Sequence, residues 1–388
     1  MNQTSYISKQ VAELKPSGIR RFFDLAAQME DVISLGVGEP DFVTPWNFIE
    51  QSVHALEQGY TSYTENAGML ELRKEISAYL NGSFQLTYDP NDQVIVTVGA
   101  SQAIDLALRT VIDPGDEVII VEPSFVAYVP TVSLAGGTPV TIQTKAEDDF
   151  KLKPEQIEEA ITPKTKAIML CNPNNPTGTF LLQEELEQLA TVIEKHDLVV
   201  LSDEIYAELT YDDTYTSFAS IPNMKERTIL ISGFSKAFAM TGWRLGYATG
   251  PTEIIAAMVK IHQYTMMCAP TMAQHAALEA MKNGKQSVQE MIESYKQRRN
   301  FIVSSLNEIG LQCPNPGGAF YAFPSIKATG LTSGEFAEEL LQEEQVAVVP
   351  GDVFGANGEG YIRCSYATSI KQLDEAMKRI KRFVEKRI

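Results

Sequence analysis

The most specific chemical signal in this sequence is a segment that contains Lys236. The segment Ser235–Gly246 reads SKAFAMTGWRLG and closely follows an apolar run at Thr228–Ser232. A lysine at the end of a buried strand is unusual, because burial of an unpaired ammonium is costly. It becomes reasonable if the amine is covalently consumed, for instance as a Schiff base to an aldehyde. Arg244 could supply a fixed cation for a phosphate, and the alternative is a surface lysine and arginine beside a loop.

Asp203 and Tyr206 belong to a second segment, Ser202–Tyr206, which follows the apolar run Leu198–Leu201. An aspartate at a strand end could keep a pyridinium nitrogen protonated. Tyr206 could then reach a phenolic oxygen on the same ring. The alternative is an aspartate that caps the start of a helix, which is common.

Two further segments carry weaker signals. Asn172–Gly178 reads NPNNPTG, and its Asn and Pro residues make a rigid turn that either aims an amide side chain or serves only as a turn. Val98–Ala103 lies between a predicted strand and a predicted helix, where small residues such as Ala100 let backbone N–H groups approach a phosphate. Gly36–Pro40 is not a dinucleotide-binding GxGxxG motif, because the third glycine is absent.

These segments are expected to meet, because each follows a predicted strand of one parallel sheet and ligands of open α/β sheets bind at the carboxyl ends of the strands. Together they offer an amine, an acid, an amide, a phenol and a phosphate-binding loop, which match the needs of pyridoxal phosphate. Helical patterns such as Gln102–Arg109 and Gln183–His196 alternate with the strands, and this alternation predicts an α/β fold with a mostly parallel sheet. The predicted strands are Val94–Val98, Glu117–Val121, Pro139–Ile142, Ala167–Cys171, Leu198–Ser202 and Thr228–Ser232.

The pattern changes after about Gln286, which predicts a second, smaller α+β domain. A long polar helix is expected to reach Ile309. The first 45 residues have no strong period of their own and are expected to pack against this domain. We therefore place an N-terminal segment at 1–45, the large domain at 46–285 and the small domain at 286–388. The short strands predicted in the small domain lie near Ala319–Phe323, Val346–Val349 and Tyr361–Tyr366.

The composition excludes several classes of function. The formal net charge is -18, which disfavours nucleic acid and anionic membranes as partners. The 4 cysteines and 4 histidines show neither CxxC nor HExxH spacing, so no metal site and no disulfide framework are expected. The first residues do not resemble a signal peptide, and no run reaches the roughly 20 apolar residues that span a bilayer. We expect a cytoplasmic protein.

With these motifs, the chain resembles the class I/II aminotransferases of fold type I over essentially its whole length. Asn172–Gly178 is similar to the family's NPxNPTG, Asp203–Tyr206 to its DEIY and Ser235–Gly246 to its SKxxxxxGxRxG. The resemblance implies that Lys236 forms the Schiff base with pyridoxal phosphate and that Asp203 is the partner of the ring nitrogen. It also implies a large domain with a mostly parallel seven-stranded sheet and a smaller α+β domain.

The same resemblance implies the other cofactor contacts. Tyr206 and Asn175 match the groups that bind O3′ of the ring, and Phe125 lies where the family stacks an aromatic side chain on it. Tyr63 matches a tyrosine that reaches the phosphate of the neighbouring subunit, which implies a homodimer with active sites at the subunit interface. The residues that the resemblance and the helix start assign to the phosphate are Ala100, Ser101, Gln102, Ser235 and Arg244.

Substrate binding is implied for Arg363, Gly38 and Asn175. Arg363 matches the arginine that clamps the substrate α-carboxylate, and a guanidinium fork suits a carboxylate. Gly38 matches a backbone position beside that carboxylate. One departure from the family is Gly233, because many relatives carry a serine there, and it weakens the assignment of side-chain donors to the phosphate.

The implied reaction moves an amino group from an L-amino acid to a 2-oxo acid, with 2-oxoglutarate as the expected acceptor, by a ping-pong mechanism. The chain looks most like the bacterial subgroup that includes aspartate, aromatic and N-acetyl-diaminopimelate aminotransferases, and Ser17–Arg20 is similar to that subgroup too. Arg20 could reach a second substrate carboxylate or be a surface charge. The sequence leaves the donor and the acceptor open.

Three other functions are compatible with some of these sequence features. A β-lyase that cleaves C–S bonds shares the cofactor motifs, so the sequence separates the two reactions poorly. A transcription regulator with an aminotransferase-like sensor would need a DNA-binding domain before Gly36–Pro40, which starts too early. An inactive scaffold is disfavoured by the intact Lys236, Asp203, Tyr206 and Arg363.

Overall fold

A seven-stranded sheet forms the core of the part of the chain that the computed structural model describes, which is residues 6–14, 18 and 29–388. The strand order is β2-β8-β7-β6-β5-β3-β4. Strands β3 to β7 are parallel to their neighbours among themselves, and β8 is antiparallel to both β2 and β7. The predicted α/β fold with a mostly parallel sheet is therefore confirmed. The strands are β2 Val94–Thr97, β3 Glu117–Glu122, β4 Thr138–Gln143, β5 Thr165–Cys171, β6 Val199–Asp203, β7 Thr228–Gly233 and β8 Gly246–Thr249.

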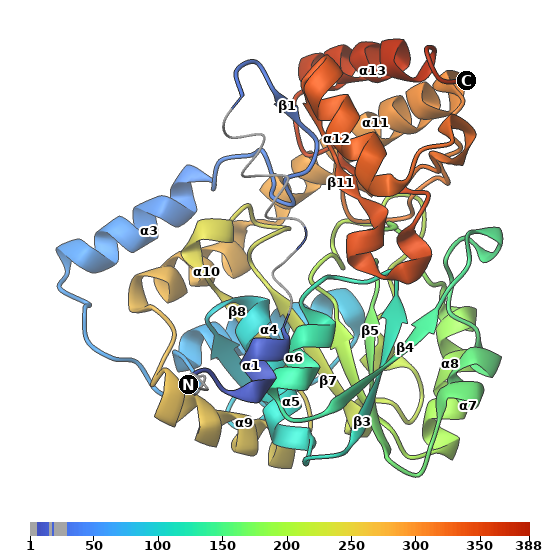
Figure 1. Cartoon of the computed structure of the whole chain (residues 1–388). Coiled ribbons are helices and arrows are strands. Elements are labelled where there is room, and N and C mark those ends of the chain that lie inside the picture. The colour runs from blue at the N-terminus through green and yellow to red at the C-terminus, as the bar shows by residue number, and fades with distance from the viewer. Residues whose placement is uncertain (1–5, 15–17, 19–28) are drawn as a thin grey trace.

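Helices cover both faces of this sheet, which explains why its strands read as continuous apolar runs (Figure 1). In β7, Ile229 and Ile231 pack with residues of α5 and α9, whereas Leu230 faces the opposite side. Helix α8 packs its apolar stripe, with Leu189 and Ile193, against the face that carries Ile119. The helices on the first face are α5 Gly99–Val111, α6 Tyr128–Leu134 and α9 Thr252–Thr265, and those on the second are α7 Pro154–Ala160 and α8 Gln183–Lys195.

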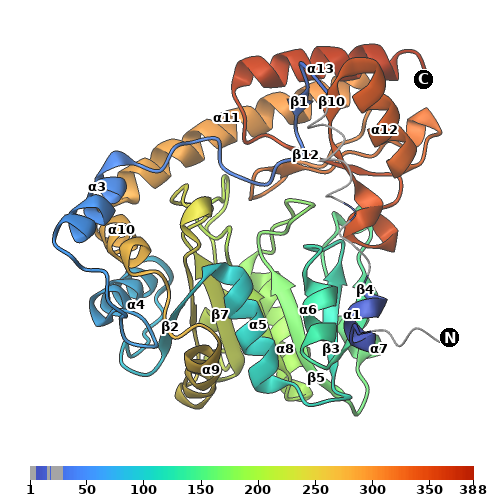
Figure 2. The same ribbon diagram turned by 60° about the vertical axis from the view of Figure 1, so that its left-hand side comes forward.

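The C-terminal elements form a separate layer above the carboxyl ends of the parallel strands, as Figure 2 shows. We call this layer the C-terminal unit. It contains an antiparallel sheet of order β11-β12-β9 and a short parallel pair, β1 with β10. Its elements are α11 Lys285–Ile309, β9 Tyr321–Ala322, α12 Ser333–Glu344, β10 Val346–Ala347, β11 Val349–Pro350, β12 Ile362–Ser365 and α13 Ile370–Val384.

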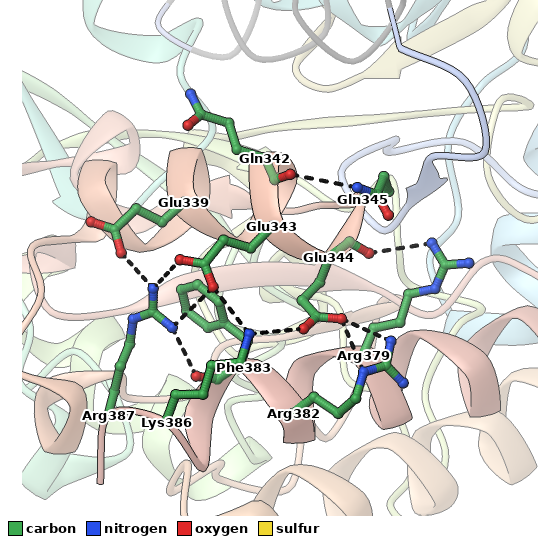
Figure 3. Close-up of polar contacts among 10 residues, drawn as sticks. All are labelled: Glu339, Gln342, Glu343, Glu344, Gln345, Arg379, Arg382, Phe383, Lys386 and Arg387. Atoms are coloured by element: carbon green, nitrogen blue, oxygen red, sulfur yellow. Dashed lines mark hydrogen bonds and ion pairs between the residues drawn. The ribbon is translucent and has the colours of Figure 1, made fainter.

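Helices α12 and α13 are joined by ion pairs (Figure 3). Glu344, at the end of α12, accepts hydrogen bonds from Arg382 at 2.8 and 3.1 Å and from Lys386 at 3.4 Å. Glu343 pairs with Lys386 and Arg387. The end of α12 is thus tied by ion pairs to the last turn of α13 and to the residues that follow it.

The N-terminal segment is divided between the two layers. Strand β1 Ile33–Ser34 pairs with β10 of the C-terminal unit, whereas α1 Lys9–Glu13 lies against α6, where Gln10 donates to the carbonyl of Ser133. Helices α3 Trp46–Glu57, α4 Leu70–Phe84 and α10 Thr271–Asn283 pack together beside β2. The boundaries at 45/46 and 285/286 stay a prediction, and Arg20 lies outside the described residues.

Among the described residues, no helix combines the length and the apolar character needed to cross a membrane. The same residues contain no group of three or more His, Cys, Asp or Glu side chains that could hold a metal ion.

Candidate active site

A cavity of about 700 Å³ lies between the carboxyl ends of the parallel strands and the C-terminal unit. Its size is ordinary for a site that holds a small ligand. Segments far apart in the sequence contribute to it, because the strands end at one edge of the sheet and β12 faces that edge. The predicted site residues that line it are Gly38, Ala100, Ser101, Phe125, Asn175, Asp203, Tyr206, Ser235, Lys236, Arg244 and Arg363.

Lys236 lies just beyond the end of β7 and points its amine into the cavity. Its Nζ donates a hydrogen bond of 2.5 Å to the carbonyl oxygen of Gly38 and lies 6.0 Å from the centre of the Tyr206 ring. Burial lowers the pKa of Lys236 to about 8, against the opposing charge of Glu39. The neutral, nucleophilic fraction of this amine near neutral pH is therefore far larger than that of an ordinary lysine, although the protonated form still predominates there.

Asp203 is the last residue of β6 and is only 5% exposed. Its Oδ2 accepts a hydrogen bond of 2.6 Å from the hydroxyl of Tyr128, and its Oδ1 accepts one of 3.2 Å from the backbone of Ile205. Burial raises the pKa of Asp203, while these two donors and the charge of Lys236 oppose that rise. The carboxylate is fixed in orientation and would gain from a cationic partner in the cavity.

Arg363, on β12, is 4% exposed and is held by two neutral acceptors. Its guanidinium donates to Asn175 Oδ1 at 2.9 Å and to the carbonyl of Gly36 at 2.7 Å, and the Tyr321 ring lies 4.4 Å from its Cζ. Its Nε is buried without a hydrogen-bond partner. Because its bonded partners carry no charge, the guanidinium is suited to an anion such as a carboxylate.

Tyr321, which the sequence did not single out, lies beside both Tyr206 and Gly38. The hydroxyls of Tyr206 and Tyr321 are 2.9 Å apart. A Cβ on Gly38 would lie 2.7 Å from the Tyr321 hydroxyl oxygen, so a side chain larger than glycine cannot fit there without a shift. The close approach explains why the backbone at residue 38 can border the cavity.

The start of α5 and Arg244 form a cradle at another side of the cavity. Gly99 has a φ of +76°, and a Cβ there would lie 2.7 Å from Nη2 of Arg244. Ala100 and Ser101 line the cavity in the first turn of the helix, where free N–H groups favour an anion. Gln102 is not among the lining residues, because its side-chain oxygen accepts a hydrogen bond of 2.6 Å from the backbone of Val98.

Tyr63 lies away from this cavity, and its side chain is 78% exposed. Two lining residues that the sequence analysis missed, Tyr128 and Tyr321, are buried aromatics with a polar tip that contacts a predicted site residue. A buried tyrosine in an apolar segment looks like core in sequence. The only signal in the sequence is that a buried tyrosine hydroxyl needs a hydrogen-bond partner, which can be a residue of a site.

The donor set fits pyridoxal phosphate. The cavity combines the amine of Lys236, the carboxylate of Asp203, the phenol of Tyr206 and a cradle at α5 that suits a phosphate. Glycine at position 99 keeps this cradle open, because a Cβ there would fill it.

The chain matches known proteins over nearly its full length. Residues 30–380 match the family described as "Aminotransferase class I and II". The chain is 64% identical to "Putative aminotransferase YugH" of Bacillus subtilis, with 99% of each protein covered, and 46% identical to an aspartate aminotransferase of Pyrococcus abyssi, with 98% of the chain and 99% of that protein covered. The solved aromatic aminotransferase of Pyrococcus horikoshii is similar with a TM-score of 0.90 at 45% identity, covering 95% of this chain and 99% of that one.

Proposed function

The chain belongs to the class I and II aminotransferases, and we propose that it uses pyridoxal phosphate to move the amino group of an L-amino acid to a 2-oxo acid. The observation that carries this proposal is the amine of Lys236, whose pKa is lowered to about 8 in a cavity that also holds Asp203 and Arg363. A reactive amine, a buried acid and an anion-binding guanidinium are the groups that such a transfer requires.

Pyridoxal phosphate supplies an aldehyde that condenses with amines and a ring that accepts an electron pair. Lys236 would hold it through its amine. Asp203 would stabilise a protonated ring nitrogen, and the held orientation of its carboxylate supports this role. Tyr206 and Asn175 would donate to O3′, and Phe125 would lie against the ring. The phosphate would be held by Arg244, Ser101 and Ser235, with the backbone of Ala100 and Gln102.

The residues of the chain would then orient the substrate and move its proton. Arg363 would bind the α-carboxylate, with Asn175 and the backbone of Gly38 beside it. Lys236 Nζ, once released from its bond to the cofactor, would take the proton from the substrate Cα, since a pKa near 8 suits proton transfer near neutral pH. The donor and the 2-oxo acid would use the same site in turn, which is a ping-pong sequence.

We propose 2-oxoglutarate as the acceptor and an aspartate, aromatic or N-acetyl-diaminopimelate type of donor. The names of the relatives support these classes of donor, because they include aspartate and aromatic aminotransferases at 44–46% identity and one named for N-acetyl-LL-diaminopimelate at 44%. Arg20 either binds a second substrate carboxylate or is a surface charge.

We also propose a homodimer with shared active sites. Large apolar side chains are exposed on α3 and on two nearby segments, which is costly for a single chain in water. They include Trp46 and Leu56 on α3, Tyr60 and Tyr63 after it, and Tyr264, Met266 and Met267 at the end of α9. A partner that covers this face would bring Tyr63 to the phosphate of the other subunit.

The test is the visible absorption of the purified protein with pyridoxal phosphate, before and after single L-amino acids are added. We expect an absorption band that some amino acids bleach and that 2-oxoglutarate restores. After reduction with borohydride, the peptide that contains Lys236 should carry the mass of the cofactor. Release of pyruvate from cysteine conjugates without bleaching would instead favour a β-lyase, and a protein that never takes up the cofactor would refute the proposal.

A further inference from the structure

The loop Phe354–Asn357 of the C-terminal unit lies against the end of β3, a contact that the proposed mechanism does not use. The amide nitrogen of Asn357 donates to the carbonyl of Glu122 at 3.2 Å and to the carbonyl of Thr144 at 2.5 Å. Both acceptors are carbonyls, so only the NH₂ group of this side chain can face them. Asn357 thereby joins the C-terminal unit to the ends of two strands of the large sheet.

The backbone of the same loop makes further contacts with the segment that follows β3. The N–H of Ser124 donates to the carbonyl of Phe354 at 2.9 Å. Gly355 has a φ of +135° and lies so close to the side chain of Glu122 that a Cβ would be 2.7 Å from its Cδ. The backbone of Ala356 hydrogen-bonds the Glu122 carboxylate. This bond opposes the rise in the pKa of Glu122 that burial causes. The contact is thus polar, close and specific.

The two sides of this contact carry two of the proposed site residues. On the side of the large sheet, Ser124 is followed directly by Phe125, which lines the cavity. On the other side, the Phe354 ring lies 5.0 Å from the guanidinium carbon of Arg363. The loop therefore sets where the ring of Phe125 and the guanidinium of Arg363 stand relative to each other, although they belong to different layers of the fold.

We propose that Asn357 is a positioning residue for the aminotransferase reaction. Its two hydrogen bonds hold the loop Phe354–Asn357 against the ends of β3 and β4. Through that loop they fix Arg363 at the distance from Phe125 at which an amino acid bound by Arg363 would meet the cofactor that lies against Phe125. This inference rests on the proposed roles of Arg363 and Phe125. It predicts that loss of the bonds weakens substrate binding far more than turnover, because the grip on the α-carboxylate is the same in the bound substrate and in the transition state.

The test compares Asn357→Asp with the matched control Asn307→Asp. Asp keeps the shape of the side chain but removes both N–H donors. Asn307 also donates to two carbonyls, those of Val303 at 2.9 Å and Cys313 at 3.1 Å, but all of these groups lie within the C-terminal unit. For Asn357→Asp we expect KM for the amino acid and for the 2-oxo acid to rise about tenfold, with kcat changed by less than about threefold. Asn307→Asp should leave KM unchanged even if it lowers the thermal midpoint.

Hydrogen exchange supplies a second readout that needs no activity. In the cofactor-free protein, the Ser124 amide should exchange faster in Asn357→Asp than in wild type, and at the wild-type rate in Asn307→Asp. If Asn357→Asp does not fold, Asn357→Ala removes the same donors without a charge facing the carbonyls. An unchanged KM together with unchanged Ser124 exchange would overturn the inference. Wild-type protein without transaminase activity would refute the proposed function instead. The exchange rate of Ser124 would still show whether Asn357 holds the loop against β3.

Discussion

Lys236 is the residue whose chemistry depends most on its surroundings. Burial lowers its pKa, the nearby carboxylate of Glu39 raises it, and the guanidinium groups of Arg363 and Arg244 lower it further. The result is an amine that is half neutral near pH 8 instead of above pH 10. This difference matters because only the neutral amine attacks an aldehyde or accepts a proton.

This pKa predicts the pH dependence of Lys236 labelling. In the cofactor-free protein, the rate at which a limiting acylating reagent modifies Lys236 should rise with pH and reach half its maximum near pH 8. Mass spectrometry of the digested protein measures the rate, and the exposed Lys381 serves as the internal standard. In Glu39→Gln the midpoint should move to lower pH, because a charge that raises the pKa has been removed. A midpoint above pH 10 in the wild type would contradict the assigned environment.

At the same scale, the sequence identifies residues that carry a charge or belong to a motif more readily than the residues that hold those side chains in place by hydrogen bonds. Lys236 stands out because burial of a charge is costly and needs a reason, Asp203 because it ends a predicted strand, and Arg363 because it matches a motif of the family. Tyr128 and Tyr321 do not, since a buried tyrosine is ordinary in a core. Their contacts with Asp203 and Tyr206 depend on which segments meet in space, and no local pattern contains that information.

At the scale of the elements, one strand of the seven-stranded sheet was not predicted, and its direction matters. Strand β8 has four residues, GYAT, and begins only two residues after Arg244. It was too short to be recognised from a repeating pattern. It is antiparallel to both β2 and β7, so β2 runs in the same direction as β7. The start of α5 therefore reaches the same edge of the sheet as Lys236, as expected from the mostly parallel sheet that the sequence predicts.

The contact between α12 and α13 predicts unequal effects for two neighbouring glutamates. Glu344 and Glu343 each pair with two cations, but the side chain of Glu344 is 9% exposed and that of Glu343 is 37% exposed. We expect Glu344→Gln to lower the free energy of unfolding by about 1–3 kcal/mol, because it removes the charge of a buried carboxylate that pairs with two cations. Glu343→Gln should cost less than about 1 kcal/mol, since water and salt screen an exposed pair.

Denaturant unfolding at low and high salt measures both effects. The loss in Glu343→Gln should shrink further in about 1 M salt, where charges are screened beyond roughly 3 Å, whereas most of the loss in Glu344→Gln should persist. Neither variant should change KM, because both side chains lie outside the set that lines the cavity. Equal losses in the two variants would show that burial does not govern this cluster.

At the scale of the whole molecule, one proposed site residue, Tyr63, lies away from the cavity that the described residues form. Tyr63 is 78% exposed, and the other large apolar side chains that are exposed include Trp46 and Tyr264. A two-fold dimer places the same surface of each subunit against the other. Such an arrangement would both cover the apolar face and bring Tyr63 to the partner's cavity. One dimer would therefore account for the exposed face and for the position of Tyr63.

Shared sites predict recovery of activity when two inactive variants are combined. Tyr63→Ala should lose activity because the phosphate loses a contact, and Lys236→Ala because the amine is gone. In a dimer with one subunit of each kind, one site takes its lysine from the Tyr63→Ala subunit and its tyrosine from the Lys236→Ala subunit, so that site is native. If the subunits are co-expressed in equal amounts and pair at random, about a quarter of wild-type activity should return. The mixed dimers can be isolated by two different affinity tags. Activity no higher than that of the separate variants would mean that each subunit builds its site alone, and Tyr63→Ala at full activity would remove Tyr63 from the site.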